Sequence, residues 1–105
     1  MADTTVFHDV TPILFACSKK YIEDRYRAKY TPPDADKGTA TMSIDGHFPA
    51  SPTTFDLNFD FNPSTGDLIY SFIQKQGYLP ISAAWSVLAD GIDACGGKGT
   101  QAQDQ

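Results

Sequence analysis

The strongest constraint on the fold is the segment from Phe55 to Phe61, in which four large apolar residues alternate strictly with three polar ones. Because side chains of a β-strand point alternately to opposite faces, this pattern predicts a strand with one buried face. Residues 62–66 are typical of a turn, and residues 67–73 form a second strand-like run. The two runs are therefore predicted to pair as an antiparallel hairpin.

Other segments predict further strands and a loop. Residues 39–44 also alternate and are followed by a turn signal, Asp45-Gly46. Residues 30–38 are rich in proline, aspartate and glycine and lack periodicity, so we expect a surface loop there. Residues 4–8 are β-prone and suit an additional strand at an edge of the sheet.

Two helices are predicted, one before and one after these strands. Thr11 is suited to cap the first helix, with Pro12 at its first position, and we expect this helix to extend to about Arg27. The second follows Pro80 and ends at the glycine pair 96–97. Residues at spacings of three and four predict buried stripes of Ile13, Leu14, Cys17, Tyr21 and Arg25 on the first helix, and of Ile81, Ala84, Trp85, Leu88, Ile92 and Cys95 on the second.

The order of these elements predicts an α+β fold. We expect a two-layer sandwich, in which an antiparallel sheet of three to four strands is covered by an N-terminal and a C-terminal helix. The length of 105 residues and the hydrophobic content of 41% suit a single domain over residues 1–105, with residues 98–105 as a flexible tail.

The charge of the chain restricts its partners. A formal net charge of −5 disfavours binding to nucleic acid or to an anionic membrane surface, because both attract cationic proteins. No apolar run approaches the roughly 18 residues of a membrane-spanning helix. Most basic residues lie between Lys19 and Lys37, a run that is usually a solvated surface, and within it Arg25 and Arg27 are candidate binding residues.

The two cysteines, Cys17 and Cys95, lie near opposite ends of the chain and on the predicted stripes of the two helices. A disulfide between them fits the predicted packing, and two free buried thiols are the alternative. We expect the disulfide, and with it an oxidising, extracellular setting, because the first residues also suit a secreted chain trimmed of its leader. Free thiols would instead indicate a cytoplasmic protein.

The sequence predicts neither a metal site nor a cofactor. It contains no CxxC, HxH or HExxH motif, and its two histidines are 39 positions apart. Asp34 and Asp36 are spaced as in a calcium loop, but the glutamate required at the twelfth position is missing.

A catalytic hypothesis uses His47 with Glu23 or Asp24, as in a small acid–base hydrolase or ribonuclease. Nothing in their spacing requires these side chains to meet. The chain also lacks a glycine-rich phosphate loop and a nucleophile elbow. Catalysis is therefore the alternative interpretation.

A binding hypothesis uses the polar face of the central strand, which carries Asp56, Asn58 and Asp60. An acidic strand face is compatible with solvent or with a basic partner surface. Solvent is the ordinary explanation for such a face, and under the binding hypothesis these three residues are candidates together with Arg25 and Arg27.

The segment from Trp85 to Gly97 resembles the helix–cysteine–glycine segment of some small secreted fungal proteins, which include killer-toxin-like and effector-type α+β sandwiches. The similarity covers about the last quarter of the chain. This chain has one potential disulfide where many of those proteins have several. The resemblance implies secretion, a compact α/β sandwich and action by binding.

The sequence thus predicts a small secreted protein, effector- or toxin-like, that binds another macromolecule, preferably a protein, without catalysis. Two alternatives remain. One is the hydrolase or ribonuclease with His47, and the other is an acidic cytosolic immunity or chaperone-type protein that binds a basic partner. The oligomeric state is not indicated.

Overall fold

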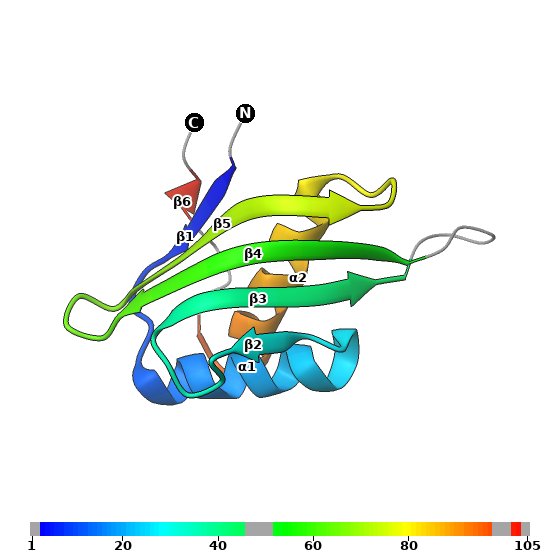
Figure 1. The fold of residues 1–105 in the computed structure, drawn as a ribbon. Helices are drawn as coiled ribbons and strands as arrows, with labels where there is room; N and C mark the ends of the chain where they lie inside the picture. The colour runs from blue at the N-terminus through cyan, green and yellow to red at the C-terminus, as the bar shows by residue number, and fades with distance from the viewer. Residues whose placement is uncertain (1–2, 46–51, 98–101, 104–105) are drawn as a thin grey trace.

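The structure is a computed structural model that describes residues 3–45, 52–97 and 102–103. Two helices and six strands are assigned in this part of the chain (Figure 1). In chain order they are β1 (Thr4–Phe7), α1 (Pro12–Tyr26), β2 (Lys29–Thr31), β3 (Lys37–Ile44), β4 (Thr53–Asn62), β5 (Asp67–Gln76), α2 (Ile81–Ala94) and β6 (Ala102–Gln103). The α+β class predicted from the sequence is confirmed.

The strands form a single antiparallel sheet in the order β2-β3-β4-β5-β1-β6 (Figure 1). The predicted hairpin is β4–β5, in which Phe59 is opposite Tyr70 and Phe61 is opposite Leu68. Within the described ranges the sheet has five strands of three residues or more and the two-residue β6, so the expected three to four strands were too few.

The predicted starts of both helices are confirmed. The Thr11 hydroxyl accepts a hydrogen bond from the Leu14 N–H at 3.0 Å, and Pro12 occupies the first helical position, where no N–H is needed. The helix α2 starts after Pro80, and the Gly97 N–H donates to the carbonyl of Ile92 at its C-terminal end. None of the helices in the described segments is long and apolar enough to cross a membrane.

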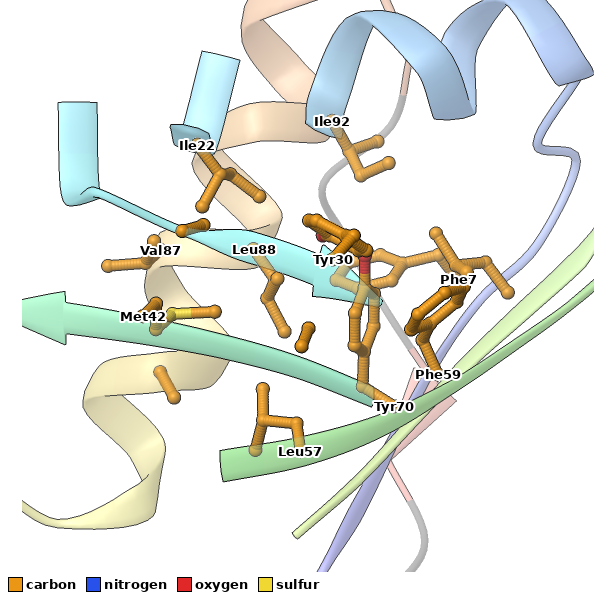
Figure 2. Close-up of a cluster of buried hydrophobic side chains, with 14 of the residues drawn as sticks. Phe7, Ile22, Tyr30, Met42, Leu57, Phe59, Tyr70, Val87, Leu88 and Ile92 are labelled. Carbon is orange, nitrogen blue, oxygen red and sulfur yellow. The ribbon is translucent and has the colours of Figure 1, made fainter. Parts of the chain in front are cut away.

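One hydrophobic cluster joins one face of the sheet to both helices (Figure 2). The strands contribute Phe7, Tyr30, Ala40, Met42, Phe55, Leu57, Phe59, Phe61, Leu68 and Tyr70, and the helices contribute Phe15, Ile22, Ala84, Trp85, Val87, Leu88 and Ile92. The alternation read from β3 and β4 therefore identified the buried face of these two strands correctly.

The buried face of α1 matches the predicted stripe only in part, because Leu14 and Tyr21 are half-buried against the core. Phe15, Ser18 and Ile22 are buried, whereas Ile13 is 83% exposed and Cys17 is also exposed. The polar Ser18 is tolerated inside because its hydroxyl donates to the Phe15 carbonyl at 2.9 Å. Because this serine interrupts the apolar periodicity, the sequence pattern did not identify the buried face in full.

The helices approach each other closely at Gly91 of α2. A Cβ atom at this position would lie 3.1 Å from side-chain carbons of Ile22 in α1. The glycine, which costs a helix roughly 1 kcal/mol relative to alanine, is therefore explained by packing between the two helices.

The predicted loop over residues 30–38 is only partly correct, because Tyr30 is buried and belongs to β2. Its ring packs against Phe59, with 5.0 Å between ring centroids. A Cβ at Gly38 would collide with the Thr31 carbonyl oxygen, so glycine permits the close pairing of β2 with β3. The missed strand has only three residues, too short for a periodicity argument.

Both ends of the described chain add to the sheet. The β1 strand pairs with β5, and its other side pairs with β6, so the predicted edge strand lies inside the sheet. Of the predicted tail over residues 98–105, only Ala102–Gln103 lies within the described residues, and it forms β6.

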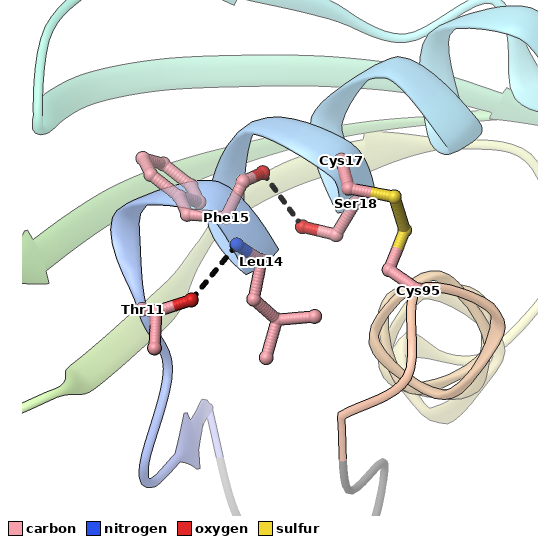
Figure 3. The surroundings of a disulfide bond; sticks show 6 residues. All are labelled: Thr11, Leu14, Phe15, Cys17, Ser18 and Cys95. Atoms are coloured by element: carbon pink, nitrogen blue, oxygen red, sulfur yellow. Dashed lines mark hydrogen bonds between the residues drawn. A yellow bond between two sulfur atoms is a disulfide. The ribbon is translucent and has the colours of Figure 1, made fainter.

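The disulfide between Cys17 and Cys95 is present and joins α1 to the C-terminal end of α2 (Figure 3). The two Cα atoms are 5.9 Å apart, and the bond links residues separated by 78 positions. Cys17 is exposed and Cys95 is half-buried, so the bond connects the helices near the surface rather than within the apolar core. A disulfide of this kind indicates an oxidising setting.

Candidate binding site on the outer face of the sheet

The candidate binding residues Asp56, Asn58 and Asp60 lie on β4, at the positions that alternate with its buried apolar residues. Asn58 and Asp60 are exposed and Asp56 is half-buried. We call the side of the sheet that carries these alternate positions the outer face. In Figure 1 the helix α2 lies behind the strands, so the outer face is turned towards the viewer.

The strand register arranges the outer face in rows that cross the sheet. The central row comprises Thr31, Thr39, Asn58, Ser71 and Thr4, one residue from each of five neighbouring strands. One flanking row comprises Lys29, Thr41, Asp56 and Gln74, and the other comprises Lys37, Asp60, Ile69 and Val6. The central row contains hydroxyl and carboxamide side chains and no charge.

A depression of about 450 Å³ lies over the middle of the central row. Its lining includes Thr39, Asn58 and Ser71 from that row, together with Asp60, Lys37 and Ile69 from one flanking row. Two of the three binding residues predicted on β4 therefore line one shallow, open depression.

The outer face is not uniformly acidic. Asp60 is directly opposite Lys37 in the register of β3 and β4, and Asp56 shares its row with Lys29. The Asp56 carboxylate also accepts a hydrogen bond of 2.7 Å from the Gln74 side-chain amide. The acidic pattern read along β4 alone is thus balanced by lysines of neighbouring strands.

The two candidate arginines lie elsewhere, at the C-terminal end of α1. The Arg25 guanidinium is stacked over the Tyr21 ring at 4.7 Å, and Arg27 is the C-cap residue, with a left-handed φ of 54°. An ion pair of 3.8 Å joins Arg27 to Asp45. Both arginines are exposed, and neither lines the depression on the outer face.

Of the residues in the catalytic hypothesis, the structure describes Glu23 and Asp24. Glu23 and Asp24 are both exposed on α1, and Asp24 forms an ion pair of 3.4 Å with Lys20 in the preceding turn. His47 lies outside the described residues.

The structure does pair the other histidine with a carboxylate, which the sequence did not reveal. His8 Nδ1 lies 2.8 Å from Asp67 Oδ1, although the two residues are 59 positions apart. They meet because the loop after β1 is held against the β4–β5 turn by a hydrogen bond from the Val10 N–H to the Gly66 carbonyl. Only the three-dimensional pairing of β1 with β5 brings them together.

A second hollow, of about 440 Å³, lies beside His8 and is also lined by Thr11, Ile13 and the disulfide. A carboxylate on one imidazole nitrogen orients the ring as in a general base. However, the Thr11 hydroxyl already caps α1, and both cysteines are oxidised. The disulfide therefore offers no thiol nucleophile to this histidine.

In the described part of the chain, no three His, Cys, Asp or Glu side chains are grouped so as to hold a metal ion. No protein-family model matches the sequence, and no curated protein or solved structure is significantly similar to it.

Proposed function

We propose that this chain is a secreted, non-catalytic protein that binds a macromolecule through the outer face of its sheet. The observation that carries the proposal is the depression on that face, which Asn58 and Asp60 line. In this proposal the two helices cover one face of the sheet, as a two-layer sandwich, and leave the other face to the ligand. Binding of this kind requires no cofactor.

The disulfide supports the extracellular part of the proposal, because such bonds persist in oxidising compartments. It also weighs against the cytosolic immunity or chaperone-type alternative. The specific form that we propose is effector- or toxin-like action on a host or a competing cell. The partner would then be a macromolecule at the surface of that cell.

Because the charges of the outer face are balanced, this face suits a different kind of partner from the one expected for an acidic surface. The acidic pattern along β4 is compatible with a basic protein surface. With Lys29 and Lys37 in the flanking rows, electrostatic attraction to a strongly basic protein is reduced. A partner recognised mainly by hydrogen bonds fits this face better.

The proposal is tested by blocking the face. A variant with Asn58→Arg and Ser71→Arg fills the depression, and Ser86→Arg on the exposed side of α2 adds the same side chain elsewhere. We expect the oxidised wild-type protein and the Ser86 variant to bind cell-wall or membrane-protein fractions of target cells, and the double variant to lose at least tenfold in affinity. Equal binding by all three proteins would refute the use of this face.

A further inference from the structure

We infer that the ligand of the outer face is an uncharged polysaccharide chain that lies along the central row. This inference rests on the proposed function, because it names the partner of the same site. It is carried by the chemistry of the row, by its length and by the charges on its two sides.

The side chains of the central row match the hydrogen-bonding character of sugars. Hydroxyl groups of threonine and serine both donate and accept hydrogen bonds, and the carboxamide of asparagine does the same through two atoms. Every member of the row, Thr31, Thr39, Asn58, Ser71 and Thr4, belongs to one of these types. Sugar hydroxyls are likewise donors and acceptors, so either partner can supply the proton at each contact.

The geometry of the row favours an extended chain over a compact ligand. Neighbouring strands lie about 4.8 Å apart, so five residues on five strands form a row about 19 Å long. The depression occupies only the middle of this row, at Thr39, Asn58 and Ser71. A ligand that contacted the whole row would have to extend across the sheet, as several linked sugar units do.

The flanking rows favour an uncharged ligand. Lys29 and Asp56 lie on one side of the central row, and Lys37 and Asp60 lie on the other. A polyanion would meet both aspartates, and a polycation would meet both lysines. Ile69, half-buried beside Asp60, adds an apolar surface against which the C–H groups of a sugar ring can pack.

Strand propensity alone does not explain this composition. Threonine is frequent in strands, so its presence on a solvated face needs no ligand. Asparagine, in contrast, is depleted in strands, and Asn58 is exposed in the central strand β4, at the middle of the row and in the wall of the depression. Its carboxamide is therefore placed to hydrogen-bond a ligand that lies in the depression.

The experiment measures binding of cello-, xylo-, chito- and laminarihexaose to the oxidised protein by calorimetry, and maps the contacts by NMR on ¹⁵N-labelled protein. We expect at least one of these uncharged hexasaccharides to bind and to shift the amide signals of Thr39, Asn58 and Ser71. Asn58→Ala should weaken binding about tenfold, as expected for one or two lost hydrogen bonds. Thr39→Val, which retains the shape of the side chain, should weaken it several-fold, and Ser86→Ala should leave it unchanged.

Any one of three outcomes would overturn the inference. One is that no hexasaccharide binds, and another is that binding is insensitive to both Asn58→Ala and Thr39→Val. A third is that an acidic hexagalacturonate binds as tightly as the uncharged chains. If no sugar binds but the double arginine variant loses a protein partner, the polysaccharide is excluded while the proposed function stands.

Discussion

The hydroxyl groups of Tyr30 and Tyr70 lie 2.6 Å apart in the core and form a hydrogen bond. The residues belong to β2 and β5 and point towards each other (Figure 2), and both are at most 2% exposed. They are 40 positions apart in the sequence. The bond satisfies two hydroxyl groups whose burial would otherwise be costly. It also connects the short strand β2 to β5, which lies beyond β3 and β4 in the sheet.

Replacing either tyrosine alone should lower the free energy of unfolding by more than half as much as replacing both. Tyr70→Phe leaves the Tyr30 hydroxyl buried and unpaired, which we expect to lower the free energy of unfolding by about 1–3 kcal/mol. In the double variant, Tyr30→Phe with Tyr70→Phe, no hydroxyl is left unpaired. Urea denaturation of the two single variants and the double variant measures the coupling, and additivity within about 0.5 kcal/mol would contradict it.

The same pair predicts a loss of stability at alkaline pH. Burial raises the pKa of Tyr70 well above its usual 10.0 and also raises the pKa of Tyr30. The unfolded chain therefore releases these protons near pH 10, while the folded chain retains them. Their contribution to stability is fully present below about pH 10, and above it the free energy of unfolding should fall by about 1.4 kcal/mol per pH unit for each tyrosine.

Denaturation at a series of pH values from 8 upwards, recorded by circular dichroism, tests this slope. The double phenylalanine variant is the control, and its decline above about pH 10 should be shallower than that of the wild type by about 3 kcal/mol per pH unit. Parallel curves for the two proteins would show that these tyrosines do not titrate differently on unfolding.

The parts of the fold that the sequence predicted are those with strong local signals. The alternation from Phe55 to Phe61 reflects a strand with one solvated face, and the cap at Thr11 is a local hydrogen bond. The predicted stripe of α1 was right only in part, because Leu14 and Tyr21 pack against the core. The polar Ser18 is buried there, and the apolar Ile13 is exposed. Tyr30 was missed because its burial depends on Phe59 and Tyr70, which are distant in sequence.

In the candidate site, too, the features with a local sequence signal were predicted, and those that depend on distant residues were not. Asp56, Asn58 and Asp60 were predicted on one face of a strand, and that prediction needed only the period of two. The lysines that balance the two aspartates belong to β2 and β3, so the charge of the face depends on register. Register is set by the pairing of whole strands, and no single segment of the sequence encodes it.

The burial of α1 can be checked with two neighbouring residues. Phe15 is 3% exposed, and its ring centroid lies 4.8 Å from that of Phe61, so Phe15→Ala should lower the free energy of unfolding by about 3–5 kcal/mol. Ile13→Ser, at a residue that is 83% exposed, should change it by less than about 0.5 kcal/mol. Thermal or urea denaturation distinguishes the two, and a larger effect at Ile13 would restore the stripe predicted from the sequence.

The disulfide should supply a large part of the stability. In the chain-entropy model, a bond between residues 78 positions apart restricts the unfolded chain by about 4–5 kcal/mol. We expect the variant with Cys17→Ala and Cys95→Ala to lose about this amount, and reductant to lower the urea midpoint of the wild type to a similar value. Reductant should have no effect on the double variant, and an unchanged wild-type midpoint would contradict the prediction.

A buried hydroxyl in β1 offers a stabilising substitution. The Thr5 side chain is fully buried, and its Oγ1 has no hydrogen-bond partner among the described residues. Thr5→Val keeps the branched shape and removes a group whose burial is costly, so we expect the free energy of unfolding to rise by about 1 kcal/mol. Thr4→Val, at the half-buried neighbour on the outer face, is the matched control and should change it by less than about 0.5 kcal/mol. Destabilisation by Thr5→Val, measured by urea denaturation, would mean that the Thr5 hydroxyl is paired in the folded protein.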